Sequence, residues 1–142
     1  MTGVDVGYEI PSRDFRITRE TLVRYAGASG DFNVIHWNER IAHEVGLPDV
    51  IAHGMLTMGM AIQVVTDWCE DPSALVDYGC RFTRPVVVPD DGVGATLHVS
   101  GTVTAVEDNI ATVSLKAMCA DVSVLGKACL LYTSPSPRDP RE

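Results

Sequence analysis

The sequence predicts an α+β fold in which a curved antiparallel sheet of about five strands wraps around one long central helix. Segments with helical spacing lie mainly in the first half of the chain, and segments with alternating apolar residues follow in the second half. One helical segment, residues 54–68, is apolar nearly all the way round, which is typical of a helix buried on most of its sides. A sheet with one apolar face can cover such a helix, so we expect a single domain.

The first half of the chain is expected to contain one strand and two short helices before the central helix. Residues 4–17 alternate loosely between apolar and polar side chains, which indicates an irregular entry followed by a short strand. Thr18 stands where it can cap a short helix that ends at Gly27. Asn38 stands where it can cap a second one, over residues 39–45.

The second half is expected to supply the sheet, because apolar residues recur there with period two. Gly79 and Pro85 interrupt the first of its segments, which is either one bent strand or a strand pair. Gly126 is expected to mark a bulge in the last strand. The predicted strand segments are residues 75–88, 97–105, 111–119 and 122–132.

The last ten residues do not fit this domain. Residues 133–142 contain three prolines and no apolar side chain, so they cannot join a core. We interpret them as a disordered end or as a sequence foreign to the natural protein. The folded domain is therefore expected to comprise residues 1–132.

Composition limits the function. At 142 residues the chain can form one core but is short for an enzyme that encloses a long substrate, so we expect a partner subunit. The formal net charge of −8 argues against nucleic acid, whose phosphates require clustered Lys and Arg. The longest apolar run, residues 55–65, is too short to insert across a bilayer, and no secretion signal is evident. Four scattered cysteines are typical of reduced thiols in a cytoplasmic protein.

Residues able to transfer or orient a proton gather in a segment too irregular to be a helix or a strand. They are Asp31, Asn33 and His36. Asp31 and His36 lie five residues apart across a turn, so both can reach one bound water or hydroxyl group. The alternative is that Asp31 only caps backbone N–H groups while His36 packs beside Trp37. Asn33 is expected to hold the loop or to orient one of the pair.

Gly54 stands at the start of the central helix. A helix N-terminus offers unpaired N–H groups and partial positive charge, and glycine lets a thioester carbonyl approach the backbone closely. Gly54 is therefore a candidate oxyanion hole; the alternative is a tight turn only. His53 either faces this site or caps the helix. Met55 and its neighbouring methionines either fill the core or line an acyl tunnel.

A metal site is not expected from the sequence. Asp31, His36, His43 and His53 are the candidate ligands, but no His-x-x-x-His or cysteine pair places two of them at coordinating spacing. Neither a glycine-rich phosphate loop nor a Gly-x-Ser-x-Gly elbow is present.

Two segments together resemble a known family. Tyr25-x-x-x-Ser29-Gly30-Asp31-x-Asn33-x-Ile35-His36, followed by His53-Gly54-Met55 at the start of an apolar helix, resembles the signature of MaoC-like (R)-specific hydratases and dehydratases, which have the hotdog fold. The resemblance covers roughly residues 4–130. Within the family it is greatest to the catalytic B subunits of heterodimeric (3R)-hydroxyacyl-acyl carrier protein dehydratases. Val34 stands where the family usually has proline, and Ile62 where some relatives have a supporting serine.

The resemblance implies the dehydration of (3R)-hydroxyacyl thioesters to trans-2-enoyl thioesters, or the reverse hydration, in fatty-acid or mycolic-acid metabolism. The substrate would be carried on the phosphopantetheine of acyl carrier protein or coenzyme A, and no metal or redox cofactor is required. His36 would take the C2 proton and Asp31 would protonate the leaving hydroxyl, although a coupled pair titrates as a unit. The supporting residues would be Ser29, Asn33 and His53, and the substrate contacts Met55, Arg81 and Arg84.

Two alternatives and the oligomeric state stay open. A hotdog thioesterase would need a carboxylate on the central helix, where only Gln63 and Asp67 are available. A non-catalytic subunit that binds an acyl carrier would need no acid–base pair. Because one hotdog domain leaves a sheet edge uncovered, we expect either a homodimer or a heterodimer with a related hotdog subunit.

Overall fold

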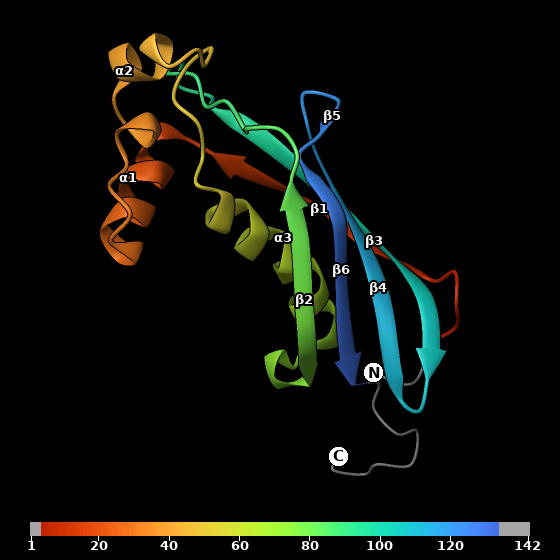
Figure 1. The fold of residues 1–142 in the computed structure, drawn as a ribbon. Helices are drawn as coiled ribbons and strands as arrows, with labels where there is room; N and C mark the ends of the chain where they lie inside the picture. Colours follow the sequence, from red (N-terminus) through yellow and green to blue (C-terminus); the bar gives the residue numbers. More distant parts are fainter. Residues whose placement is uncertain (1–3, 134–142) are drawn as a thin grey trace.

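The computed structural model of the protein describes residues 4–133. They form an antiparallel sheet of six strands with one long helix, α3, against it (Figure 1). The main path of the sheet is β1-β3-β4-β6-β2, and the short β5 pairs with β4. The elements are β1 (Glu9–Ile17), α1 (Arg19–Ser29), the 3-10 helix η1 (Val34–His36), α2 (Glu39–Glu44), α3 (Gly54–Cys69), the 3-10 helix η2 (Pro72–Ala74), β2 (Leu75–Phe82), β3 (Ala95–Glu107), β4 (Ile110–Cys119), β5 (Val122–Ser123) and β6 (Leu125–Thr133).

The predicted α+β class and the curved sheet around a helix are confirmed. The sheet is open, with β1 and β2 as the edge strands of its main path. Alternate residues of β3 and β4 point into the core, as their period-two pattern predicted; Leu97, Val99, Val103 and Val113 are fully buried. The turn between these strands holds Asp108 and Asn109 at positive φ, a conformation that Asp and Asn tolerate better than most residues.

Helix α3 packs on the sheet with one side. Its buried residues are Thr57, Ala61, Val64 and Val65. On another side Met55 is 61% exposed. The expectation that α3 is buried on most sides is therefore wrong for this chain by itself, because the sheet covers one face and no other element within residues 4–133 encloses the rest.

Helix α1 leads into the candidate site loop and is longer than predicted. Thr18 caps it as expected, in a reciprocal pair of hydrogen bonds with Thr21. The helix continues past Gly27 to Ser29 and ends at Gly30, whose φ of 79° is the left-handed conformation common at helix ends. Ser29 is thus a helical residue, and the irregular loop begins after it.

The segment before α3 is held by a loop instead of by the sheet. Only residues 75–82 of the predicted strand over 75–88 join the sheet, as β2. Residues 86–88 lie beside residues 50–52, where Ala52 N–H donates to the Val86 carbonyl at 2.9 Å and Val88 N–H to the Val50 carbonyl at 3.0 Å. This pairing fixes the direction in which the chain enters α3.

The predicted last strand is divided in two. β5 and β6 replace the single strand expected over residues 122–132, and the irregularity beside Gly126 lies at Lys127, whose φ is 49°. A Cβ on Gly126 would stand 2.6 Å from Thr83, so glycine is required by close approach. Thr133 is the last residue of β6, one residue beyond the predicted domain boundary; residues 134–142 lie outside the described part.

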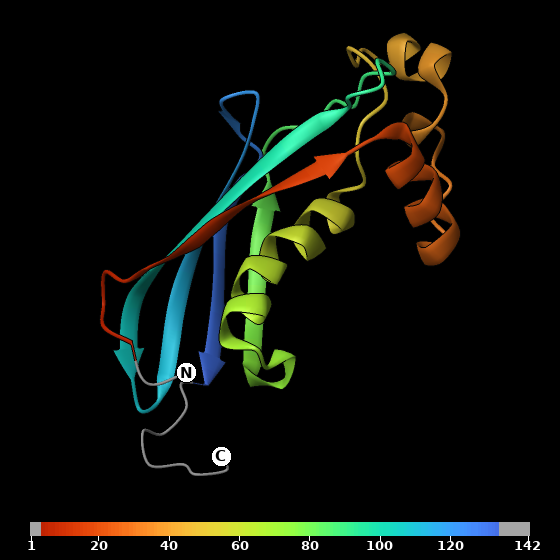
Figure 2. The same ribbon diagram turned by 180° about the vertical axis from the view of Figure 1, so that it is seen from behind.

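The helices α1 and α2 gather at the end of the molecule where α3 begins (Figure 2). They and η1 lie away from the far end of the sheet, where β3 and β4 meet in their turn (Figures 1 and 2). Among residues 4–133, no helix has both the length and the apolarity needed to cross a membrane. The loops joining α1, η1, α2 and α3 therefore meet at one end, where the candidate site is found.

Candidate active site

The loop between α1 and η1 is held by its own side chains. Ser29 Oγ accepts from Asp31 N–H at 3.2 Å, Asp31 Oδ1 from Asn33 N–H at 3.1 Å, and Asn33 Oδ1 from Ile35 N–H at 3.2 Å. Each polar side chain thus satisfies the backbone N–H two residues ahead, the pattern of an Asx or Ser turn. This ladder gives the loop a defined shape even though Val34 stands in place of a proline.

The two carboxylate oxygens of Asp31 make different contacts. While Oδ1 accepts from Asn33 N–H, Oδ2 lies 4.0 Å from Nε2 of His36. The capping role considered for Asp31 is therefore present, but it uses only one of the two oxygens. The Asp31 side chain is 51% exposed, so about half of it is open to solvent in this chain alone.

His36 is buried and its tautomer is set by a backbone bond. Its Nδ1 lies 2.7 Å from the carbonyl oxygen of Ile51, and because a carbonyl can only accept, Nδ1 carries the proton. Nε2 is left with its lone pair facing Asp31. A separation of 4.0 Å is too long for a direct hydrogen bond, but one oxygen atom can contact both groups.

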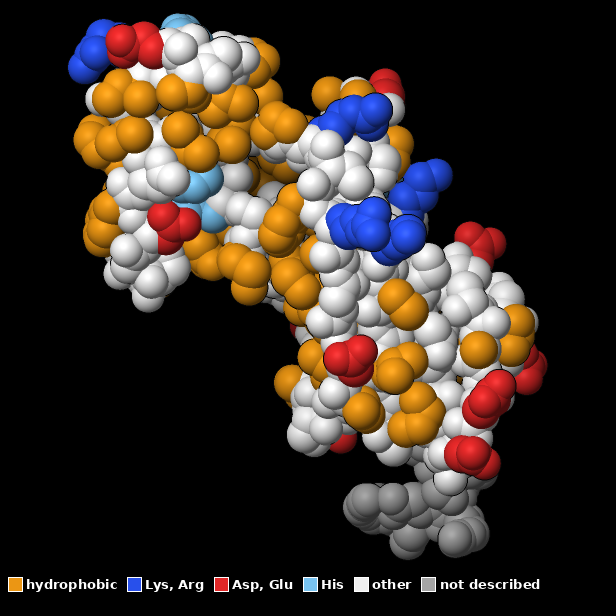
Figure 3. Space-filling view, in the orientation of Figure 1, with side chains coloured by type: hydrophobic (Ala, Val, Ile, Leu, Met, Phe, Trp, Pro, Cys, Tyr) orange, Lys and Arg blue, Asp and Glu red, His pale blue; other side chains and the backbone are white. Residues whose placement is uncertain are grey.

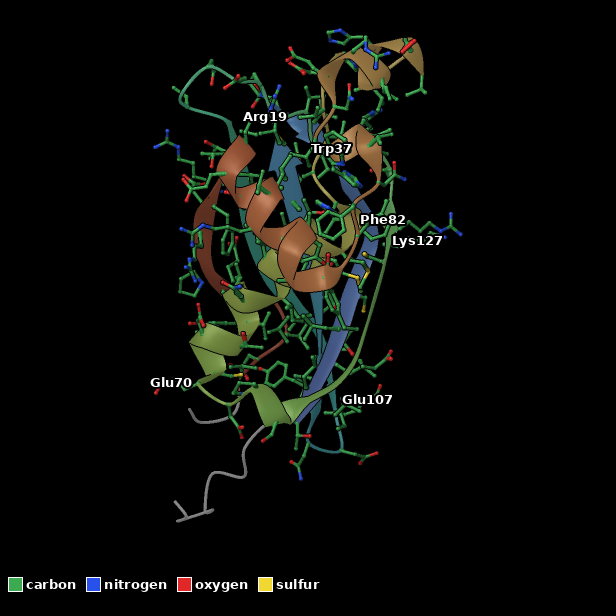
Figure 4. All side chains as sticks on the ribbon, turned by 90° about the vertical axis from the view of Figure 1, so that its left-hand side faces the viewer. Arg19, Trp37, Glu70, Phe82, Glu107 and Lys127 are labelled. Atoms are coloured by element: carbon green, nitrogen blue, oxygen red, sulfur yellow. The ribbon has the colours of Figure 1, made fainter. Side chains whose placement is uncertain are left out.

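Gly54 and His36 line one pocket of about 300 Å³. Thr57, Phe82, Arg84 and Val124 are also in its wall. A Cβ on Gly54 would stand 3.1 Å from the Phe82 ring, so the glycine keeps open a narrow space above the first turn of α3. Figure 4 labels Phe82 and Trp37, which reach this end of the molecule from β2 and from the end of η1.

His53 does not cap α3, although it occupies the N-cap position. Its Nε2 lies 3.1 Å from the carbonyl oxygen of Asp31, so Nε2–H is the donor. The ring stacks on His36 with centroids 3.8 Å apart and meets Tyr25 edge-on. Only 1% of the residue is exposed, and this burial lowers the pKa of His53 below its ordinary value. Of the two sequence alternatives for this residue, capping is wrong because His53 makes no side-chain cap bond, and its supporting role at the site stays a prediction.

The fold brings Asp31, His36 and His53 closer than their spacing suggested. One ligand atom from each lies within 4.8 Å of the others. Spacing along the chain did not indicate this cluster, because His53 comes from a segment well separated in sequence from Asp31 and His36. Two of the four ring nitrogens donate to backbone carbonyls and are not free to bind a cation. Metal-free chemistry stays a prediction.

Basic side chains stand on the other side of the pocket. Arg84 lines it, and Arg81 on β2 pairs with Gly126, next to Lys127. None of these three forms a salt bridge with any residue in the range 4–133. Figure 3 shows a hollow with His and an acidic side chain on one wall and Lys and Arg side chains gathered opposite. Positive charge is thus concentrated at this opening in a chain of net charge −8.

Comparison with known proteins agrees with this geometry. The sequence profile of the MaoC like domain matches residues 6–118, most of the described chain. This chain belongs to the MaoC-like dehydratase family. The resemblance noted in the two motif segments is therefore confirmed at the level of the family.

Individual members of the MaoC-like family are similar to parts of this chain. A 3-hydroxyacyl-thioester dehydratase X of Mycobacterium tuberculosis is 40% identical over 79 residues, which are 56% of this chain and 27% of that protein. An (R)-specific enoyl-CoA hydratase of Rhodospirillum rubrum is 35% identical over 88 residues, 61% of this chain and 60% of that protein. A solved MaoC-like dehydratase superposes with a TM-score of 0.90 at 37% identity, over 93% of this chain and 41% of that one. The hotdog fold is confirmed.

Some residues of this MaoC-like site were missed by the sequence analysis. Thr57 is buried and its Oγ1 donates to the Gly54 carbonyl at 2.8 Å, which the spacing of three residues along a helix could have indicated. Phe82 and Lys127 arrive from β2 and β6, so no local pattern pointed to them. Met55 is exposed and does not line the 300 Å³ pocket; its predicted substrate contact stays a prediction.

Proposed function

We propose that this chain dehydrates (3R)-hydroxyacyl thioesters to trans-2-enoyl thioesters, or catalyses the reverse hydration, in fatty-acid metabolism. One observation carries the proposal: His36 Nε2 and Asp31 Oδ2 face each other across 4.0 Å, beside a pocket that also contains the first residue of α3. Membership of the MaoC-like family and the dehydratase and hydratase relatives support the same reaction class. The chain spans 27% and 60% of these two relatives.

The proton at C2 of the substrate is assigned to His36. Its Nδ1–H is held by the Ile51 carbonyl, so Nε2 is the free base, and it faces Asp31 Oδ2. When Nε2 takes the C2 proton, the C2 electron pair forms the double bond to C3. The imidazolium then keeps its hydrogen bond to Ile51, which prevents the ring from turning.

The leaving group is assigned to Asp31. Protonated at Oδ2, it gives its proton to the 3-hydroxyl, and the C3–O bond breaks to release water. Hydration runs through the same atoms in reverse, with water bound between Oδ2 and Nε2. Because the carboxyl is half exposed in the chain alone, bound substrate or a partner subunit must exclude water from it before it can act as an acid.

The thioester carbonyl is assigned to Gly54. The first N–H groups of α3 have no partner within the helix and carry its partial positive charge. Negative charge on the carbonyl oxygen during C2 deprotonation would be stabilised there, an effect worth roughly 3 kcal/mol per donor. The absence of a side chain lets the carbonyl approach, since a Cβ at this position would already stand 3.1 Å from Phe82.

The carrier is assigned to the basic opening of the pocket. Arg81, Arg84 and Lys127 lack ion-pair partners among residues 4–133, and Arg84 lines the same pocket as His36. Phosphopantetheine, on coenzyme A or on acyl carrier protein, brings phosphate to such an opening while its thioester enters the pocket. No metal or redox group is required for this reaction.

A second hotdog subunit is part of the proposal. β2 is an edge strand with unpaired backbone groups, and the nearby side chains of Met55, Val76 and Phe82 are largely exposed. Either a second copy of this chain or a related subunit would cover that surface and exclude water from the active site. The predicted cytoplasmic location and the closer relation to acyl carrier protein dehydratases likewise stay predictions.

The decisive experiment follows the ultraviolet absorbance of the conjugated enoyl thioester. Crotonyl-CoA and longer trans-2-enoyl thioesters are offered to the chain alone and with a candidate partner, and the product is analysed on a chiral column. Loss of absorbance with formation of the (3R)-hydroxyacyl thioester is expected. Release of free thiol without loss of the enoyl group would instead identify a thioesterase.

The structure does not favour that rival. Asp67, the one carboxylate of α3, forms an ion pair with Arg13 and lies beside a different pocket, near Trp68. A non-catalytic subunit is distinguished in another way: activity of the assembled complex would survive the joint replacement Asp31→Asn and His36→Ala.

A further inference from the structure

His36 and His53 each donate a hydrogen bond to the backbone of the segment that carries the other. His36, after the loop, donates from Nδ1 to the carbonyl of Ile51, in the segment that enters α3. His53, in that segment, donates from Nε2 to the carbonyl of Asp31, in the loop. Ile51 N–H adds a third bond, to the Ile35 carbonyl at 3.2 Å. Two segments well separated in sequence are thus joined in both directions by imidazole donors.

The two rings that make these bonds lie face to face. Their centroids are 3.8 Å apart and their planes differ by 22°. His36 is therefore confined by a bond at Nδ1 and by a ring on one face, which leaves Nε2 a single direction in which to point. Tyr25 of α1 also contacts the His53 ring, edge-on, with centroids 4.7 Å apart.

We propose that His53 is a positioning residue whose neutral Nε2–H form sets the separation of Asp31 from His36. The proposal rests on the proposed function. His53 is not in the wall of the 300 Å³ pocket. It acts in two ways. Its hydrogen bond to the Asp31 carbonyl fixes the backbone that carries the catalytic carboxylate, and its ring packs against the face of the His36 ring.

A purely space-filling role does not account for the contacts. A buried polar ring is costly unless it is hydrogen-bonded, and an apolar side chain of similar size would fill the same volume. His53 instead stands at an N-cap position and makes no cap bond, directing its one donor to the loop. Its Nδ1 is buried and finds no partner within residues 4–133, which is a cost retained at this position.

The charge state of His53 follows from its surroundings. The ionisable groups that face it are His36, Asp31 and Tyr25, from η1, the loop and α1. Burial lowers the pKa of His53, and a positive His36 would lower it further, while the Asp31 carbonyl and carboxylate act in the opposite sense. Since the two stacked rings disfavour a double positive charge, His36 can take a proton during the reaction only while His53 stays neutral.

The first test needs no activity. Nitrogen-15 NMR of the folded, histidine-labelled protein reports the tautomer and the titration of each ring. We expect His53 to be the Nε2–H tautomer and to titrate below its ordinary pKa of 6.5. An Nδ1–H tautomer, or protonation at 6.5 or above, would overturn the proposal whatever the enzyme assay gives.

The second test separates the hydrogen bond of His53 to the Asp31 carbonyl from the stacking of its ring on His36. His53→Gln places an amide donor near the position of Nε2 but removes the stacked ring, whereas His53→Phe keeps a ring and removes the donor. We expect His53→Phe to lower kcat by about 10²-fold with little change in KM, because a misplacement near ~1 Å is enough for that loss. His53→Gln should recover part of kcat and shift the pH profile of the reaction, since His36 loses its stacked neighbour.

His43→Phe is the matched control, because His43 also donates to a backbone carbonyl, that of Pro48, but is exposed on α2 away from the pocket. It should leave kcat and the pH profile unchanged. A His53→Phe enzyme with wild-type kcat would overturn the proposal, as would equal losses in both His53 variants with an unchanged pH profile. If the wild-type chain shows no hydratase activity in any assembly, the proposed function fails while the NMR result still decides the state of His53.

Discussion

At the scale of single residues, the site depends on how each polar atom is used. Asp31 gives one carboxylate oxygen to the loop and turns the other toward His36, and His36 gives one nitrogen to the backbone and keeps the other free. The same residues are therefore structural and functional at once. Capping and catalysis are not competing explanations for these residues, because each side chain has enough polar atoms for both.

Replacing Asp31 by Asn should separate these two uses. The amide oxygen can still accept from Asn33 N–H, so the loop and the thermal stability should be nearly unchanged. The amide cannot deliver a proton, so kcat should fall by roughly 10²–10⁴-fold. Enoyl-thioester turnover and a melting curve on the same sample check this. Asp91→Asn is the control, because Asp91 caps the distant turn at Val93 and Gly94.

Gly54→Ala tests the space above α3. The new methyl group would meet the Phe82 ring at 3.1 Å, and Phe82 is an exposed side chain that can move. We expect normal folding but a loss of about 10²-fold in kcat/KM, because the carbonyl can no longer approach the helix N-terminus. The double variant Gly54→Ala with Phe82→Ala relieves the packing contact. Recovery of activity in it would place the defect in the Phe82 ring instead of in the oxyanion hole.

At the scale of elements, the position of the loop depends on where α1 ends. The helix stops at Gly30 with φ of 79°, immediately before Asp31. Gly27 could have ended it earlier, and its sequence signal is equivalent, but a glycine within a helix does not by itself end it. The end is decided by the Ser29 and Asp31 turn, which offers the backbone a better set of hydrogen bonds beyond Gly30.

Gly27 within α1 and Gly30 at its C-terminal cap should respond oppositely to alanine. Gly30→Ala forces a side chain into the left-handed conformation and should lower the free energy of unfolding by about 1–2 kcal/mol. Gly27→Ala lies in the helix with open space around it and should raise that free energy by about 0.5–1 kcal/mol. Urea unfolding measures both. Equal effects of the two substitutions would mean that α1 does not end as described.

At the scale of the whole molecule, charge is distributed unevenly. Arg13, Arg19, Arg24 and Arg40 are paired with carboxylates, whereas Arg84 in the pocket wall and the basic residues Arg81 and Lys127 on the paired strands β2 and β6 have no such partner among residues 4–133. An acidic protein that keeps these cations beside one pocket favours an anionic ligand there.

Reversal of charge at this opening should affect carriers differently. Arg81→Glu with Arg84→Glu should raise KM for an enoyl-CoA by about threefold to tenfold, since exposed ion pairs are each worth under about 1 kcal/mol. KM for the enoyl N-acetylcysteamine thioester, which has no phosphate, should not change. Arg24→Glu with Arg40→Glu is the matched control on α1 and α2. An equal rise in KM for both substrates would remove the phosphate from the explanation.

Stability should also depend on pH through the buried His53. The folded state lowers its pKa, so below 6.5 the unfolded chain binds more protons than the folded one. The free energy of unfolding should therefore be highest above 6.5 and fall as the pH drops from there toward the folded-state value. Urea unfolding across this range checks the sign. In His53→Gln this part of the pH dependence should disappear.

Local patterns determined a large part of this protein. Caps at Thr18 and Asn38, period-two alternation in β3 and β4, and the motif around Asp31, His36 and Gly54 were visible because each depends on residues close along the chain. Only the tertiary structure decided what meets across the chain: His53 on the Asp31 carbonyl, Phe82 over Gly54, Lys127 beside Arg81, and one face of α3 left uncovered. The physical reason is that these contacts depend on strand register and on the direction in which loops enter helices, and neither leaves a periodic trace in the sequence.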